Sequence, residues 1–186
     1  MTNEEAVYMR HMNLKTAASE LGVKWQSLYS RLRTAGVKVA GDKLRYGSDR
    51  DRLGALAEVE FKRLVPAAID NNKDKFQAKV DFVVRGHLVD VKASHLRRLS
   101  KKHDALSWSF SFKKQSLVAD FIVCFCIGEA KQTEHLLLVP SEFFHGLQTV
   151  SVSASGRSKW LDYAVDPLDL AKFFDSLPLG GATPKQ

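Results

Sequence analysis

Near the amino terminus, apolar residues recur at helical spacing in two neighbouring stretches. The first has the i, i+3, i+4, i+7 spacing of a short helix, with Asn13 as its cap. Its apolar residues are Leu14, Ala17, Ala18 and Leu21. After a break at Gly22, the second stretch places a further set along one side: Trp25, Leu28, Tyr29 and Leu32. With a preceding helix from about Glu4 to His11, the pattern predicts a three-helix unit at residues 1–39.

The polar residues of the second stretch point mostly away from its apolar side. They are Lys24, Gln26, Ser27, Ser30, Arg31 and Arg33. The segment from Leu14 to Leu32, with Ala-Ala-x-x-Leu-Gly-Val at its centre, resembles helix-turn-helix segments of bacterial DNA-binding proteins. The resemblance implies that the second helix enters the major groove, where these polar side chains meet base edges or phosphates. A plain helical hairpin used for packing or dimerisation is the alternative.

Beyond a charged, Gly-containing connector at 40–51, the chain has the pattern of an α/β domain over 52–177. A helix is predicted over 52–65 and stopped by Pro66. Its apolar stripe is Leu53, Leu56, Ala57, Phe61, Leu64 and Val65. Short apolar runs predict strands at 80–85, 88–94, 107–112, 121–127 and 135–139. A last helix is predicted at 167–176, and residues 178–186 are expected to be a flexible tail.

The segment from Val80 to Ala93 alternates like a β-hairpin. A two-residue turn with Gly86 first, as in a type II′ turn, pairs Asp81 with Lys92. One face is then apolar and consists of Val80, Phe82, Val84, Val89, Val91 and Ala93. The other face places Asp81 opposite Lys92 and diagonal to Asp90. The pattern therefore brings two carboxylates and a lysine to one patch.

Clustered carboxylates beside a lysine suit phosphodiester hydrolysis. The carboxylates bind a hard cation such as Mg²⁺, and the lysine orients the attacking water or stabilises charge on the phosphate. A third acid would complete the site, and Glu58 is favoured over Glu60 because it flanks the apolar stripe at Ala57. An exposed cross-strand salt bridge between Asp81 and Lys92 is the alternative.

Three segments together resemble the PD-(D/E)XK nuclease superfamily. Asp81, eight intervening residues and Asp90-Val91-Lys92 resemble its paired motif, with Val80 in the place of the leading proline. Upstream, the run from Gly54 to Glu58 resembles the Gly-x-x-Ala-Glu opening of the first core helix in many members. A downstream stretch resembles the second half of the same core. It consists of Trp108-Ser109-Phe110, of Lys113, Lys114 and Gln115, and of the apolar strand from Phe121.

The resemblance spans residues 53–144 and implies a restriction-endonuclease-like core, in the order helix, three strands, helix, strand, preceded by the small helical module. It implies a Mg²⁺-dependent deoxyribonuclease in which Mn²⁺ substitutes. The implied metal ligands are Asp81, Asp90, the Val91 carbonyl and Glu58. Lys92 takes the catalytic position. The implied DNA contacts are Lys113, Lys114 and Gln115.

Charge and composition agree with a DNA partner. The formal net charge is +7, and basic residues gather near the start and again in the middle of the chain. Cutting two strands requires two active sites, which favours a homodimer. No apolar run approaches the roughly 20 residues of a membrane span, so a cytoplasmic protein, bacterial or phage-encoded, is expected. Cys124 and Cys126 share one strand face and are expected to be reduced core thiols.

Other functions remain open at this point. A non-catalytic helix-turn-helix regulator, with a sheet domain that dimerises or senses a ligand, fits the same segments. Within the nuclease class, restriction, homing, recombination and repair roles are all compatible with the motifs. The histidines are scattered without the short spacings of zinc ligands, so they offer no competing site.

Overall fold

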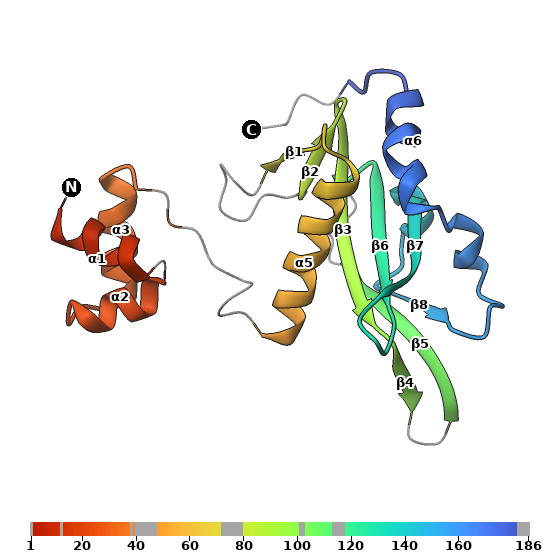
Figure 1. Cartoon of the computed structure of the whole chain (residues 1–186), viewed down its shortest axis with the longest axis horizontal. Helices are drawn as coiled ribbons and strands as arrows, with labels where there is room; N and C mark the ends of the chain where they lie inside the picture. Colours follow the sequence, from red (N-terminus) through yellow and green to blue (C-terminus); the bar gives the residue numbers. More distant parts are fainter. Residues whose placement is uncertain are drawn as a thin grey trace. The chain divides into compact units, whose positions relative to one another are not determined.

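The computed structural model describes residues 2–11, 13–37, 39, 48–71, 80–100, 103–112 and 118–181, and it leaves out the side chains of residues 99, 100, 103 and 104. The chain divides into two compact units, Met1–Arg52 and Leu53–Gln186 (Figure 1). Each unit has a core of its own, so each is described by itself.

The described residues of the first unit form three short helices. They are α1 (Asn3–His11), α2 (Leu14–Glu20) and α3 (Trp25–Thr34). Their shared core is formed by Val7, Tyr8, Ala17, Ala18, Leu28 and Leu32. The predicted cap is confirmed, because Asn13 Oδ1 accepts a hydrogen bond from the Thr16 amide at 2.9 Å. Gly22 ends α2 in the left-handed region at φ +64°, where a residue without a Cβ is favoured.

One expectation for this unit is wrong. Trp25 was assigned to the apolar side of its helix, but it is 43% exposed and lies outside the core. Trp25 is the first residue of α3, and the buried residues of this helix are Leu28 and Leu32.

The described residues of the second unit form two sheets and two α-helices. The five-stranded sheet has the order β1-β2-β3-β6-β7, and the three-stranded sheet has the order β4-β5-β8. In the first sheet β3 and β6 run parallel, and the other neighbours are antiparallel. The strands are β1 (Ile69–Asp70), β2 (Phe82–Val84), β3 (His87–His95), β4 (Arg97–Ser100), β5 (His103–Ser111), β6 (Phe121–Ile127), β7 (Thr133–Pro140) and β8 (Thr149–Ser153). The α-helices are α5 (Asp49–Leu64) and α6 (Leu170–Ser176), and the 3₁₀ turns are η3 (Ser141–Phe144), η4 (Lys159–Tyr163) and η5 (Pro167–Asp169). The expected mixed α/β fold class is confirmed.

The five-stranded sheet is covered on both faces. On one face, α5 and α6 pack through Ala57, Phe61, Leu170 and Phe174 against alternate residues of β2, β3, β6 and β7. The other face contributes Ile122, Cys124, Cys126, Leu137 and Val139 to a second core, which the three-stranded sheet closes with Trp108, Phe110, Val150 and Val152. We call these the helix face and the sheet face. Because β6 is apolar on both faces, it forms the centre of the unit.

The element order differs from the expected helix, three strands, helix, strand. The strand predicted at 107–112 is part of β5, which leaves the mixed sheet and joins β4 and β8 in the second sheet. Between β5 and β6, the described residues include no α-helix; residues 113–117 lie outside the description. The second sheet has a clear physical role, because it buries the apolar residues that β6 and β7 carry on the sheet face.

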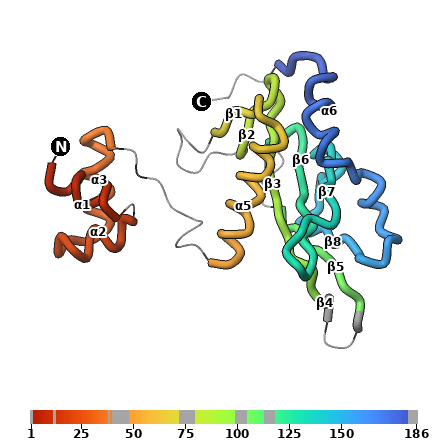
Figure 2. The backbone as a smooth tube through the Cα atoms, viewed as in Figure 1, coloured from red at the N-terminus to blue at the C-terminus, as the bar shows by residue number. Residues whose placement is uncertain are grey.

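The stripe predicted for α5 is also corrected at one position. Leu56 is 57% exposed, whereas Ala57 and Phe61 are buried and Leu53 and Leu64 pack beside them. The tube in Figure 2 shows α5 running alongside β2 and β3.

The cysteines and the chain end complete the second unit. Cys124 and Cys126 are free and buried, as expected, and burial raises the pKa of both thiols. After α6, the chain bonds to the β2–β3 turn: the Gly180 amide donates to the Arg85 carbonyl, and His87 Nε2 bonds to the Pro178 carbonyl, both at 2.9 Å. The described part of the expected flexible tail is thus hydrogen-bonded to the sheet. None of the described helices is long and apolar enough to cross a membrane.

Candidate active site

The β2–β3 turn sets the register of the hairpin that carries the candidate acids. Arg85 and Gly86 have φ values of +50° and +82°, so both central turn residues lie in the left-handed region, as in a type I′ turn. Val84 therefore pairs with His87, and Phe82 pairs with Val89. The predicted turn at Gly86 and His87 is wrong by one position, because Gly86 takes the second place of the turn and not the first.

This correction moves the cross-strand pairing by two residues, which keeps every side chain on its predicted face. Phe82, Val84, Val89 and Val91 all belong to the helix-face core, as expected. On the opposite face, Asp81 comes level with Asp90 and not with Lys92. Asp81 lies just before β2, and its backbone carbonyl accepts a hydrogen bond from the Asn71 amide at 2.9 Å.

Asp81 contacts the β3 backbone beside Asp90. Its Oδ2 accepts a hydrogen bond of 2.8 Å from the Val91 amide. The N–H and C=O of one strand residue point to the same side, so the Val91 carbonyl is directed toward the side on which Asp81 lies. The Asp81 carboxylate and the Val91 carbonyl oxygen therefore lie on the same side of β3, next to the residues that precede β2.

Asp90 is a buried acid whose carboxylate forms an ion pair with Lys92. The whole Asp90 residue is only 5% exposed. Lys92 Nζ lies 2.5 Å from Asp90 Oδ2. Burial raises the pKa of Asp90 to about 7; the Lys92 ammonium lowers it in part, and the Asp81 carboxylate raises it further.

Lys92 lies two residues beyond Asp90 on the same face of β3, and its side chain is 27% exposed. Its partner on β6 is Cys124, and the partner of Asp90 is Ile122, both members of the sheet-face core. Residues that pair across neighbouring strands share a face, so Asp90 and Lys92 lie at the edge of an apolar layer. The low polarity of that layer strengthens the attraction between the lysine and any nearby anion.

The other expected site residues are placed differently. Glu58 is half-buried on α5, the helix that packs on the opposite face through Ala57 and Phe61. The described residues contain no cluster of three or more His, Cys, Asp or Glu side chains arranged to hold a metal ion. Lys113, Lys114 and Gln115 fall outside the described residues. The structure thus brings together Asp81, Asp90, Val91 and Lys92.

The donor set of this group fits Mg²⁺ or Mn²⁺. Two neighbouring carboxylates and a backbone carbonyl are oxygen ligands, and the Asp90 carboxylate is a buried anion that a bound cation would stabilise. Mg²⁺ is commonly bound by one or two carboxylates and keeps several water molecules or substrate phosphates as its remaining ligands. Two acids are therefore sufficient for such a site.

The helical unit exposes the residues that the sequence assigned to DNA contact. Lys24, Gln26, Ser27, Ser30, Arg31 and Arg33 are all exposed on or next to α3. A hollow between α2 and α3 is lined by Lys15, Ser19, Lys24, Trp25 and Gln26, so Lys15 and Trp25 join this surface although the sequence pattern did not single them out for it. Arg31 also forms an ion pair of 2.6 Å with Glu4 of α1.

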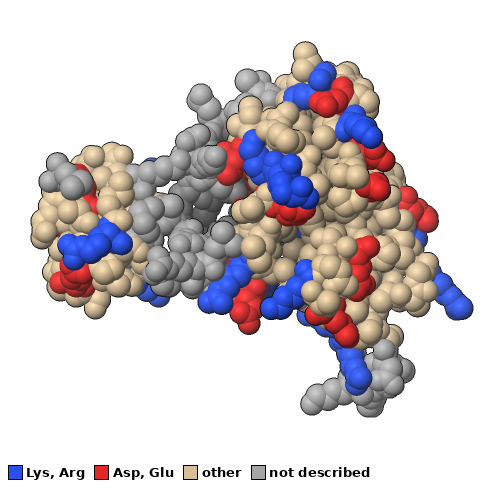
Figure 3. Space-filling model, in the orientation of Figure 1, with Lys and Arg blue, Asp and Glu red and all other residues tan. Residues whose placement is uncertain are grey.

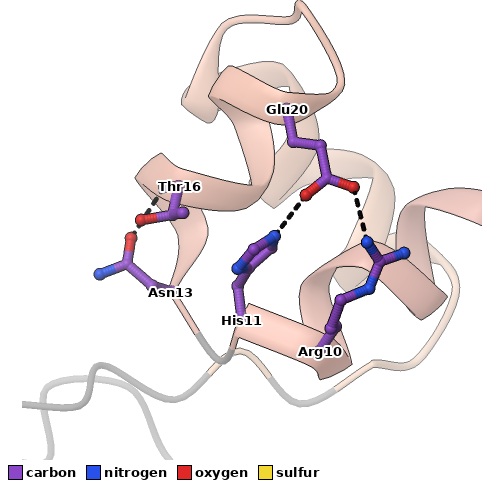
Figure 4. Close-up of polar contacts among 5 residues, drawn as sticks. All are labelled: Arg10, His11, Asn13, Thr16 and Glu20. Atoms are coloured by element: carbon purple, nitrogen blue, oxygen red, sulfur yellow. Dashed lines mark hydrogen bonds and ion pairs between the residues drawn. The ribbon is translucent and has the colours of Figure 1, made fainter.

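Polar contacts hold the helices of this unit in place (Figure 4). Glu20 of α2 accepts hydrogen bonds from Arg10, at 2.9 Å, and from His11 at the end of α1. The hydrogen bond from His11 lowers the pKa of Glu20, and the charge of Arg10 adds to the effect. These contacts are exposed, so they orient α1 on α2 more than they stabilise the unit.

The two predicted basic clusters are described only in part. Arg31 and Arg33 of the cluster near the start, and Arg97 and Arg98 of the cluster in the middle, are exposed. The other members of the two clusters lie outside the described side chains: Lys38, Lys43, Arg45, Lys101, Lys102, Lys113 and Lys114. Figure 3 shows that basic and acidic residues alternate over the drawn face of the molecule. Their distribution on this face therefore gives no separate support to a nucleic-acid partner.

No protein-family model matches the chain, and a search of curated proteins found no match. Among solved structures, the chain matches "The structure of a bacterial homing endonuclease: I-Ssp6803I" with a TM-score of 0.43 and 15% sequence identity, over 63% of this chain and 87% of that chain. At this score and identity the likeness carries no argument about function, which has to be argued from the site itself.

Proposed function

We propose that the chain is a metal-dependent DNA endonuclease of the PD-(D/E)XK type, with the helical unit contributing DNA binding. The observation that carries the proposal is the group formed by Asp81, Asp90 and Lys92: a buried carboxylate, a second carboxylate beside it, and a lysine whose Nζ lies 2.5 Å from the buried carboxylate. An exposed surface salt bridge would not bury Asp90 or place a second acid next to it.

Each residue of the group has a chemical task. Asp81 and Asp90, with the Val91 carbonyl, would hold the Mg²⁺ ion, which when bound neutralises the phosphate and lowers the pKa of its water. Asp90 must be ionised for this task, and its raised pKa makes the loss of its proton part of metal binding. Lys92 projects beside Asp90 and would orient the attacking water or stabilise charge that develops on the phosphate. Glu58 stays a candidate for a water-mediated ligand.

The rest of the proposal concerns how DNA is held. The exposed side chains of α3 would contact the major groove, as in helix-turn-helix proteins. Two copies of the chain would cut the two strands, so we propose a homodimer whose interface leaves the Asp90 face open. Sedimentation that shows a monomer both free and on duplex DNA would contradict the dimer.

A panel of DNA substrates tests the proposed activity. Supercoiled, linear, single-stranded and four-way-junction DNA should be incubated with the protein in Mg²⁺, in Mn²⁺ and in EDTA. The proposal expects nicking or linearisation that depends on the metal, and the panel also identifies the preferred DNA structure. A protein that protects one DNA site but leaves all four substrates intact would be a non-catalytic regulator.

A further inference from the structure

The outer face of the three-stranded sheet is lined with hydroxyl groups. On β5 and β8, alternate residues point into the sheet-face core, and the residues between them point outward. The outward residues form three directly paired rows: Ser107 with Ser153, Ser109 with Ser151, and Ser111 with Thr149. We call this the hydroxyl face.

Charge on the hydroxyl face has one sign. Arg97 of β4 pairs with Ser107, so its exposed side chain extends the Ser107–Ser153 row. No described residue of this face is a carboxylate. Ser107 is 1% exposed, and its Oγ has no hydrogen-bond partner among the described residues, so the hydroxyls of this face that reach solvent are those of Ser109, Ser111, Thr149, Ser151 and Ser153. The described side chains of the face therefore offer several short donors and a guanidinium, and none of them is negatively charged.

The three-stranded sheet adjoins the strand that carries the candidate active site. Asp90 and Lys92 lie on the sheet face of β3, and the three-stranded sheet packs on that same face beside them. The two regions are joined, because Ser94, two residues beyond Lys92, accepts a hydrogen bond of 2.9 Å from the Ser109 amide. This hydrogen bond places β5 next to the part of β3 that carries Lys92, so a long ligand at the candidate active site would extend along the second sheet.

The length of the strands matches an extended ligand. From Asp90 to Arg97 the chain advances seven residues, which spans at most roughly 23 Å at about 3.3 Å per residue. About seven base pairs of B-DNA cover the same distance at roughly 3.4 Å per base pair. In Figure 1 the β4–β5 ribbon continues beyond the end of the five-stranded sheet, so the surface extends further than the site.

We propose that the hydroxyl face binds the sugar-phosphate backbone of duplex DNA next to the cleavage site, with Arg97 pairing with a phosphate. Serine and threonine hydroxyls and arginine are regular donors to phosphate oxygens, and short side chains let the backbone approach the sheet closely. The inference rests on the proposed nuclease function, and it adds where the duplex lies and which residues hold it.

Cross-linking tests the location directly. Both native cysteines are buried, so Ser151→Cys introduces an exposed thiol that can carry a photoactivatable cross-linker. Ser176→Cys is the matched control, because Ser176 is an exposed serine on α6, which covers the opposite face. With a labelled 30-base-pair duplex in EDTA, we expect cross-linking from position 151 at least about tenfold above position 176. Equal yields from the two positions would overturn the proposal.

Affinity measurements identify the contact and the class of nucleic acid. Arg97→Ala should weaken duplex binding about tenfold, the equivalent of one charge-assisted hydrogen bond, and lower the log-log salt slope by about 0.9. Lys172→Ala on α6 is the control and should change neither. An unchanged slope in Arg97→Ala, or competition by duplex RNA as strong as by duplex DNA, would overturn the proposal.

The outcome is separable from that of the nuclease proposal, because binding and cross-linking are measured without metal. Hydrolysis of bis(4-nitrophenyl) phosphate in Mn²⁺ reports on the candidate active site alone. Parental hydrolysis with no cross-linking from position 151 refutes the hydroxyl face and leaves the nuclease standing. Cross-linking from position 151 by a protein that hydrolyses no substrate supports the hydroxyl face and refutes the nuclease.

Discussion

Asp90→Asn should change how the stability of the metal-free protein depends on pH. Burial holds the pKa of Asp90 at about 7, compared with 3.8 in the unfolded chain. Between these two values the folded protein binds more protons than the unfolded chain, so the free energy of unfolding falls as the pH rises from about 4 to about 7. At about 1.36 kcal/mol for each pKa unit, this shift corresponds to a fall of about 4 kcal/mol, to which the charges of Lys92 and Asp81 contribute. Asparagine cannot ionise, so the variant should lack this part of the fall.

Urea denaturation at a series of pH values in EDTA measures this effect. The Trp25→Phe background removes the fluorophore of the helical unit and leaves Trp108 and Trp160, which both belong to the sheet-face core. Asp175→Asn, at an exposed position of α6, is the matched control and should keep the parental pH profile. Above pH 7, Asp90→Asn should be more stable than the parent, because the parent then carries a buried carboxylate.

Parallel pH profiles for the parent and Asp90→Asn would refute the reasoning, because Asp90 would then titrate as an exposed acid does. Mg²⁺ extends the same test. A cation that binds the ionised carboxylate should restore parental stability above pH 7 and should not stabilise Asp90→Asn to the same extent.

Three further predictions follow from the site, the helical unit and the chain end. Lys92→Ala should keep fold and DNA binding but lower the cleavage rate by about 10² to 10³, and parental cleavage of plasmid DNA in Mg²⁺ would contradict the assignment of this residue. Removal of residues 1–39 should weaken duplex binding and lower the salt slope by about 0.9 for each lost phosphate contact, with residual cleavage; unchanged affinity would assign the helices a structural role. Gly180→Ala should destabilise the second unit by about 1 to 3 kcal/mol in urea denaturation, because the new Cβ would lie 2.6 Å from the Gly86 carbonyl oxygen, while Gly181→Ala meets no atom within 4 Å and should be neutral.

The sequence by itself determined which side chains share a face. Strand side chains alternate with a period of two, so the separation of Phe82 and Val84 from Asp81, and of Val89 and Val91 from Asp90 and Lys92, followed from the pattern alone and survived a register that differs from the predicted one. Local chemistry also sufficed for the Asn13 cap and for the helices near it, since their hydrogen bonds involve residues three or four positions apart.

Tertiary structure decided what the local pattern leaves undetermined. The turn type depends on the backbone conformation of two residues, and Arg85 takes a left-handed φ that its residue type does not favour. The sequence therefore did not predict the register that places Asp81 opposite Asp90. The second sheet joins β4 and β5 to β8, some 40 residues further along the chain, and only that non-local packing creates the apolar layer beside Asp90. The sequence could thus indicate a carboxylate next to a lysine, but its burial and raised pKa come from residues that reach it only in the folded chain, because desolvation depends on every neighbour and not on the residues adjacent in sequence.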